Sequence, residues 1–88
     1  MTCTVRIASP LRSYTAGAAT LTAHGSSLAE VLASLEQRCP GIRFRMIDEQ
    51  DQIRAHMRFF VNGAQVFDMA HALRASDAVQ IVQALSGG

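Results

Sequence analysis

The chain has 88 residues, of which 49% are hydrophobic and 17% charged, and its formal net charge is +1 at pH 7. A chain of this length forms one domain that buries about 60–70% of the surface exposed on unfolding, and this composition excludes a disordered chain. The near-neutral charge argues against a domain built to hold a nucleic-acid backbone.

The first residues lack the charged start and apolar run of a signal peptide, and no run of about 18 apolar residues could cross a bilayer. Two cysteines, Cys3 and Cys39, are too few for a disulfide framework. We therefore expect a cytoplasmic protein with reduced thiols and no membrane partner. All eight basic residues are arginine, so the chain has no lysine that could accept an isopeptide bond.

Two short strands are predicted near the start of the chain. Residues 4–8 alternate between apolar and polar side chains, and Ser9-Pro10 ends or bends this strand. Residues 19–23 predict a second strand, which follows a turn at Gly17. The short separation predicts that the two strands pair as a hairpin.

After residue 26 the spacing of apolar residues changes from that of a strand to that of a helix, so a helix is predicted there. Ser27 and Glu30 form a capping-box pattern, in which a hydroxyl and a carboxylate satisfy amides at a helix start. Pro40-Gly41 ends the helix near residue 38 or 39. One face carries apolar residues at i, i+3, i+4 and i+7, and these are Leu28, Val31, Leu32 and Leu35.

Residues 42–56 allow two interpretations. Ile42, Phe44 and Met46 alternate with arginines, which suits an edge strand, although a short helical turn before a polar loop is also compatible. Between positions 38 and 58, five arginines stand against three acidic residues. This mixture favours a solvated loop, with a weak docking patch for an acidic partner as the alternative.

The last third of the chain predicts a hairpin and a final strand. Asn62-Gly63 between apolar runs predicts a type I′ turn, which needs positive φ at both positions. Residues 68–73 predict a short helical turn, and Ser76-Asp77 precedes a strand at 78–84. One helix can cover only one face of a sheet. We therefore predict an α+β domain, in which a four- or five-stranded mixed sheet wraps one main helix.

The sequence ends in Gly87-Gly88 directly after the last predicted strand. Glycine has no Cβ, so such an arm can enter a narrow channel in another protein. Four extended residues from Leu85 reach roughly 13 Å, enough to place the Gly88 carboxylate in a partner's active site. The expected organisation is a domain over residues 1–84 and a flexible tail over 85–88, with Leu85, Ser86 and Gly87 as its arm.

Four segments, in this order and at these spacings, carry a family resemblance: the helix at 27–35, the Pro40-Gly41 stop, the hairpin at 59–63 and the closing segment 76–88. Together they resemble the β-grasp sulfur carriers of the ThiS/MoaD family, relatives of ubiquitin, over essentially the whole chain. Two features depart from the family pattern. Ser76 stands where the family often has glycine, and Gln83 occupies a region where proline is common.

The resemblance implies a chemistry at the terminus. An adenylyltransferase similar to the ubiquitin-activating enzymes uses ATP to adenylate the Gly88 carboxylate, and a persulfide then yields a thiocarboxylate. That sulfur is delivered to a substrate held in a second, sulfur-accepting biosynthetic enzyme. The domain would be a recyclable co-substrate and not an enzyme, with no bound cofactor and monomeric when free. Its three histidines lack the close spacing of a metal pair, so no metal site is expected.

The pathway stays open at this point. Molybdopterin, thiamin, cysteine and specialised sulfur-containing metabolites are all compatible with the 88 residues, and the small subunit of molybdopterin synthase is one alternative. A second class of function is a ubiquitin-like protein modifier, in which the activated Gly88 is passed to a lysine of another protein.

A partner-docking surface is expected on the predicted hairpin. Alternation along the strand places Phe59 and Val61 on one side and Phe60 on the other. If Phe59 and Val61 face the helix, Phe60 lies on the open face of the sheet, flanked by Arg58. An exposed aromatic there would anchor a partner. The alternative is that the 42–56 loop covers Phe60.

Overall fold

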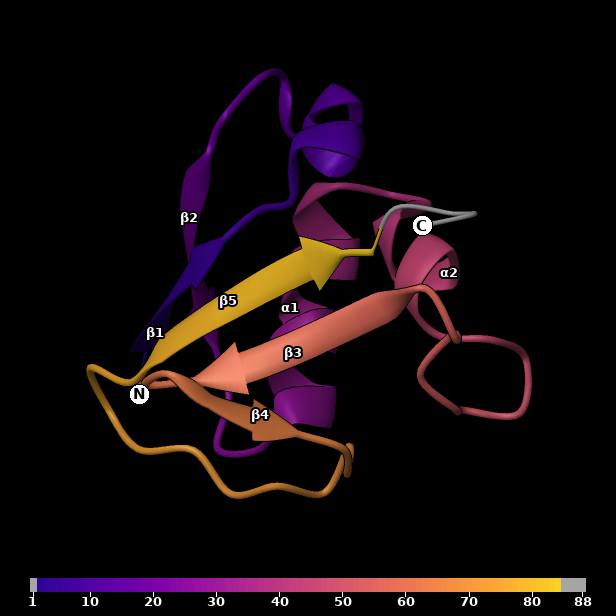
Figure 1. Ribbon diagram of the computed structural model, residues 1–88. Coiled ribbons are helices and arrows are strands. Elements are labelled where there is room, and N and C mark those ends of the chain that lie inside the picture. Colours follow the sequence, from indigo (N-terminus) through magenta and orange to yellow (C-terminus); the bar gives the residue numbers. More distant parts are fainter. Residues whose placement is uncertain (1, 85–88) are drawn as a thin grey trace.

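The computed structural model describes residues 2–84, and the predicted tail at 85–88 lies outside the described residues. It shows one five-stranded mixed sheet in the order β2-β1-β5-β3-β4, with the main helix across one face (Figure 1). β5 pairs parallel with β1 and antiparallel with β3. The strands are β1 (Thr2–Arg6), β2 (Thr20–His24), β3 (Met57–Val61), β4 (Ala64–Val66) and β5 (Ala78–Gln83). The predicted α+β class with a mixed sheet and one main helix is confirmed.

Helix α1 (Leu28–Arg38) covers the inner face of the sheet and forms the core with it. All four residues of its predicted stripe are fully buried. The strand residues that meet it alternate along each strand, as a sheet with one packed face requires. They include Val5, Phe59, Val79 and Ile81, none more than 2% exposed. None of the helices within residues 2–84 is long and apolar enough to cross a membrane.

The start of α1 carries the predicted cap with one change. The Ser27 hydroxyl accepts a hydrogen bond from the Glu30 backbone N–H at 3.2 Å. The Glu30 carboxylate reaches one residue further back than a capping box requires, and accepts from the backbone N–H of Ser26 at 2.9 Å. That bond, with a second from the Ser26 hydroxyl, lowers the pKa of Glu30.

The first two strands pair antiparallel, as predicted, but η1 lies between them. This 3₁₀ helix (Ser9–Thr15) was not predicted, and it starts with Pro10 in its first turn, where the missing N–H is harmless. β1 begins two residues before the predicted strand and ends at Arg6. The connection between β1 and β2 is therefore a short helix and not a tight turn.

Residues 42–46 form a helix, α2 (Ile42–Met46), so the short helical turn is confirmed and the alternative edge strand is wrong. Ile42 and Met46 are both fully buried, and they lie one helical turn apart on the same face. Phe44, between them, is 57% exposed. In a strand all three side chains would share one face, whereas the structure buries only the first and third.

A residue of α1 caps this short helix. The residue before α2 is Gly41, which has no side chain to accept a hydrogen bond. The Glu36 carboxylate takes that role, because it accepts from the backbone N–H of Gly41 at 2.8 Å and of Arg43 at 2.9 Å. These bonds lower the pKa of Glu36. A side chain of the preceding helix thus stabilises the start of α2.

The β3–β4 hairpin is confirmed, with φ of 50° at Asn62 and 88° at Gly63. The Asn62 side chain also ties this turn to the start of β5. Its amide oxygen accepts from the Ala78 backbone N–H at 3.0 Å, and its amide nitrogen donates to the Asp77 carboxylate at 3.0 Å. The Arg74 backbone N–H also donates to Asp77 at 2.8 Å. These bonds fix where β5 begins.

Residues 68–73 contain only a single turn, over 68–71, and not a helical turn that extends to Leu73. A single turn is closed by the His71 N–H donating to the Asp68 carbonyl at 3.0 Å. The next backbone groups bond to the start of α1 instead: the Leu28 N–H donates to the His71 carbonyl, and the Leu73 N–H donates to the Ser26 carbonyl. Because these groups already have partners outside the segment, a helix cannot use them.

Candidate functional site at the C-terminal end of β5

The terminus that carries the predicted chemistry lies just beyond the described residues. The structure describes its attachment point, the end of β5. Gln83 is opposite Met57 at the start of β3. The Ala84 N–H donates to the His56 carbonyl at 2.7 Å. The chain therefore leaves the sheet from a strand end that is held beside His56, and Leu85, Ser86, Gly87 and Gly88 follow it.

Phe60 lies on the open face of the sheet, as predicted. Phe59 and Val61 are buried against the core, and Phe60, between them, is half-buried on the opposite face. Its cross-strand neighbours are polar, with Gln80 on β5 and Gln65 on β4. Its placement opposite the helix is confirmed, while its role in docking stays a prediction.

Arg58 shares this face and is anchored at the start of β3. It lies opposite Val82 of β5. One terminal nitrogen of its guanidinium donates to the carbonyls of Ala55 at 2.6 Å and Met57 at 3.0 Å. Phe60, Val82 and the aliphatic part of Arg58 therefore form a small apolar area on a face whose other side chains are mostly threonine and glutamine, together with Arg6, His24 and Ala78.

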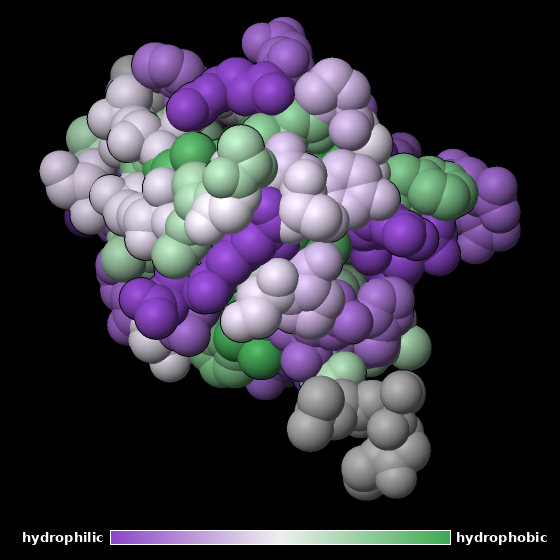
Figure 2. Space-filling view, turned by 90° about the horizontal axis from the view of Figure 1, so that it is seen from above, coloured by the Kyte–Doolittle hydropathy of each residue, from purple (hydrophilic) through white to green (hydrophobic). Residues whose placement is uncertain are grey.

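A cleft of about 450 Å³ opens on the other side of the β5 end, between η1 and α2. Figure 1 shows both helices at this end of the sheet, and Figure 2 shows the molecule from the η1 side, with hydrophilic and hydrophobic residues intermixed on its surface. No pattern in the sequence predicted this cleft. Its lining includes Tyr14, Phe44, Arg45, Arg54, His56 and Gln83.

Two arginines of the cleft are held by aromatic residues. The Arg54 guanidinium lies 4.5 Å from the centroid of the Phe44 ring, and its Nε donates to the Phe44 carbonyl at 2.7 Å. The Arg45 Nε donates to the Tyr14 hydroxyl at 2.7 Å, and its guanidinium lies 5.8 Å from that ring. Each contact joins residues far apart in sequence, so only the surplus of arginines between positions 38 and 58 signalled it.

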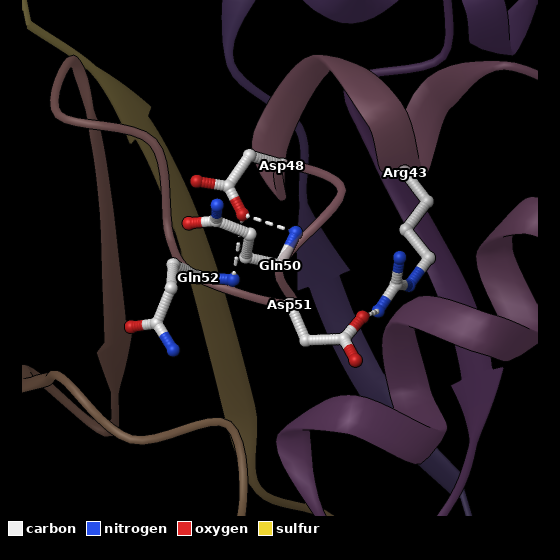
Figure 3. Close-up of polar contacts among 5 residues, drawn as sticks. All are labelled: Arg43, Asp48, Gln50, Asp51 and Gln52. Atoms are coloured by element: carbon white, nitrogen blue, oxygen red, sulfur yellow. Dashed lines mark hydrogen bonds and ion pairs between the residues drawn. The ribbon is translucent and has the colours of Figure 1, made fainter.

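The nearby acidic residues are bound elsewhere (Figure 3). One oxygen of Asp48 accepts from the backbone N–H groups of Gln50 at 2.9 Å and Gln52 at 3.0 Å, which shapes the loop. Asp51 pairs with Arg43 at 3.0 Å, the only ion pair within residues 2–84. Asp48 and Asp51 are therefore engaged away from the cleft arginines, and Glu49, the third acid of the loop, makes no ion pair within residues 2–84.

The strand order, the helix across one face and the parallel pairing of β1 with the last strand define a β-grasp protein of the ubiquitin-like class. A model of the ThiS family matches residues 5–88. The chain therefore belongs to the ThiS family, and the sulfur carrier class expected from the sequence is confirmed.

Three comparisons agree with this assignment. The chain is 32% identical to the sulfur carrier protein CysO of Mycobacterium tuberculosis, over the full length of both proteins. The crystal structure of that bacterium's CysO matches with a TM-score of 0.89 and 30% identity, and covers 94% of this chain and 99% of the other. The crystal structure of the Amycolatopsis orientalis BexX/CysO complex matches with a TM-score of 0.91 and 27% identity, and covers 98% and 99%.

Proposed function

We propose that this chain carries sulfur as a thiocarboxylate on Gly88, formed after a partner enzyme has adenylated the Gly88 carboxylate. The observation that carries the proposal is the match to the ThiS family through residue 88, on a sequence in which Gly87-Gly88 follow β5 after a three-residue segment. Glycine at both positions would let a narrow active site admit the carboxylate, since neither residue has a side chain.

The chemistry needs the activation step. A free carboxylate is a poor electrophile because its negative charge repels nucleophiles. Attack of the carboxylate oxygen on the α-phosphorus of ATP forms an acyl-adenylate and releases pyrophosphate. A persulfide sulfur then attacks the acyl carbon, and the carbon–oxygen bond to AMP breaks. Reduction of the resulting acyl disulfide by a thiol leaves the thiocarboxylate. ATP is bound by the partner, and the carrier needs no cofactor of its own.

Two kinds of partner follow from this cycle: an adenylyltransferase related to the ubiquitin-activating enzymes, and a biosynthetic enzyme that accepts the sulfur. The Amycolatopsis orientalis CysO is described in a complex with BexX, which supports docking of such a carrier on another protein. The use of ATP agrees with a cytoplasmic location, which the composition already suggested.

The open face around Phe60 and Arg58 is the docking surface that we propose for the activating enzyme. A half-buried aromatic beside an arginine is a typical interface anchor. We expect Phe60→Ala to weaken binding about tenfold, a loss of about 1.4 kcal/mol. Phe67→Ala is the matched control, because Phe67 is 79% exposed and lies after β4, outside this face. Equal affinity of the two variants would contradict docking through Phe60.

The function itself is tested by intact-mass spectrometry. The carrier is incubated with purified adenylyltransferase, ATP and a persulfide donor, with the same mixture lacking ATP as a control. We expect the mass gain of one oxygen-to-sulfur exchange, together with reaction of a thiocarboxylate-selective reagent at Gly88, since oxidation gives a similar mass. A variant without Gly88 should give neither signal. A signal that survives removal of Gly88 would refute the proposed site.

A further inference from the structure

The cleft at the end of β5 contains two guanidinium groups that have no acidic partner in the described part of the chain. Arg45 is exposed and Arg54 is half-buried. No carboxylate of residues 2–84 lies within 4.0 Å of either guanidinium, since the one ion pair among these residues joins Arg43 and Asp51. Neither positive charge is therefore neutralised by an ion pair among the described residues.

These two side chains are also oriented in advance. Each uses its Nε in an internal hydrogen bond, Arg54 to the Phe44 carbonyl and Arg45 to the Tyr14 hydroxyl. Within residues 2–84 neither makes a hydrogen bond through its terminal nitrogens. Because Nε is already bonded, each arginine side chain has less rotamer entropy to lose when a ligand binds. The N–H groups of the terminal nitrogens stay available, and their geometry matches that of a carboxylate.

The cleft also has an apolar contact surface next to this charge. The Phe44 ring is 57% exposed although the Arg54 guanidinium stacks on it. Exposed aromatic rings beside arginines are enriched among the residues that dominate interface energies. The combination favours a protein segment over a small inorganic anion, which would use only the charges.

The position of the cleft restricts which protein can reach it. Gln83 is part of its lining, and the chain runs on from there to the terminus. Four extended residues span at most roughly 13 Å, so any enzyme that holds the Gly88 carboxylate must lie beside this end of β5. The cleft and the open face around Phe60 are the two surfaces that meet there.

We propose that Arg45 and Arg54, with Phe44, form a docking site for an acidic segment of the activating enzyme. This inference rests on the proposed function. Adenylation brings the Gly88 carboxylate up to the phosphates of ATP, and like charges repel. Attraction between arginines of the carrier and carboxylates of the enzyme offsets this repulsion and accelerates encounter. The sulfur-accepting enzyme faces no such requirement, so the site is assigned to activation.

The test measures the association rate of the carrier with the purified adenylyltransferase of the same genome, at low and high salt. Arg45→Gln and Arg54→Gln are compared with Arg74→Gln. Each variant loses one positive charge, and Arg74 is exposed at the opposite end of β5, before the strand begins. We expect each cleft variant to associate about fivefold to tenfold more slowly at low salt, with the difference shrinking at high salt. Circular dichroism and thermal unfolding verify that each variant is folded.

The measured rates either support or overturn the proposed docking site. Slower association confined to the two cleft variants supports the site, whereas equal rates for all three variants, reduced or unchanged, would overturn it. Arg54→Lys is a further variant that keeps the positive charge but loses the planar guanidinium group. We expect its association rate to lie between those of wild type and Arg54→Gln. Thiocarboxylate formation is measured on the wild-type chain in parallel. If the wild-type chain acquires no sulfur, the proposed function fails and the site fails with it; if sulfur is acquired while the cleft variants associate normally, only the site fails.

Discussion

Of the glycines at 17, 25, 41 and 63, Gly25 leaves the least room for a side chain, and Gly25→Ala tests how closely α1 approaches this loop. Gly25 has a φ of +152° in the short loop between β2 and α1. A Cβ placed there would lie 2.7 Å from the Cβ of Glu30 and 2.7 Å from the backbone nitrogen of Val31. Both atoms belong to the first turn of α1, so the helix must move.

The expected loss has two parts. A non-glycine residue at such a φ costs about 1–3 kcal/mol. Displacing packed backbone adds a steric cost of about 1–3 kcal/mol. Together they give about 2–6 kcal/mol, which is a large part of the roughly 4–13 kcal/mol expected for a domain of this length. The melting temperature should fall by at least about 8 °C.

Gly63→Ala is the matched control, because Gly63 has a φ of +88° and no atom within 4 Å of an added Cβ. Its expected loss is the backbone part alone, about 1–2 kcal/mol. Both variants restrict the unfolded chain equally, so that contribution cancels in the comparison. Urea unfolding, read as a change in midpoint at constant slope, measures both. Equal losses for the two variants would refute the close approach of α1 to Gly25.

Three further predictions concern the core, the α2 cap and the thiols. Phe59→Ala should lower the free energy of unfolding by about 3–5 kcal/mol, since the side chain is fully buried, and a loss under about 1 kcal/mol would contradict the central core. The pKa of Glu36 is lowered by the hydrogen bonds that its carboxylate accepts from backbone N–H groups. The ionised carboxylate therefore stabilises the fold above about pH 4.3, and this contribution is lost as the pH falls through the folded-state pKa. Urea unfolding of Glu36→Gln against wild type should therefore show a difference at neutral pH that shrinks in acid; a difference independent of pH would exclude the charge as its cause. Cys3 and Cys39 are buried, and burial raises the pKa of the Cys3 thiol, so both should react slowly with a disulfide reagent until denaturant is added; a thiol that reacts in the native protein as fast as free cysteine would contradict this burial.

The parts of the fold that were predictable from sequence are those fixed by contacts within a few residues. The capping pattern and the apolar stripe predicted α1, and Asn62-Gly63 predicted the β3–β4 hairpin. Both depend on local backbone preferences that no distant contact opposes. The overall architecture followed, because one amphipathic helix among several strands has few ways to bury its apolar face.

The α2 segment shows where local patterns fail. Over five residues, Ile42, Phe44 and Met46 fit a strand period, while Ile42 and Met46 also fit one helical turn. The decision comes from Glu36, whose carboxylate caps the backbone at the helix start across Pro40-Gly41. That interaction depends on how α1 ends, so a window confined to residues 42–46 does not contain it.

The cleft could not be predicted for the same reason. Its two arginine contacts join Arg45 to Tyr14, 31 residues away, and Arg54 to Phe44, 10 residues away. The excess of arginine between positions 38 and 58 was visible, and a solvated loop was the favoured interpretation. The sequence did not reveal that Asp48 bonds within its own loop and Asp51 pairs with Arg43, which leaves the cleft arginines without acidic partners among residues 2–84.

If the proposed function holds, the place of β5 in the sheet explains how one small domain could serve two enzymes in turn. β5 is central, and its two ends are fixed, by Asn62 at its start and by the bond from Ala84 to His56 at its end. The open face and the cleft adjoin the same strand end, since Val82 lies opposite Arg58 and Gln83 lines the cleft. An activating enzyme that occupies both surfaces therefore blocks access to the terminus for any second protein. Transfer of sulfur then requires dissociation first, so an interface stronger than the cycle needs would slow the carrier.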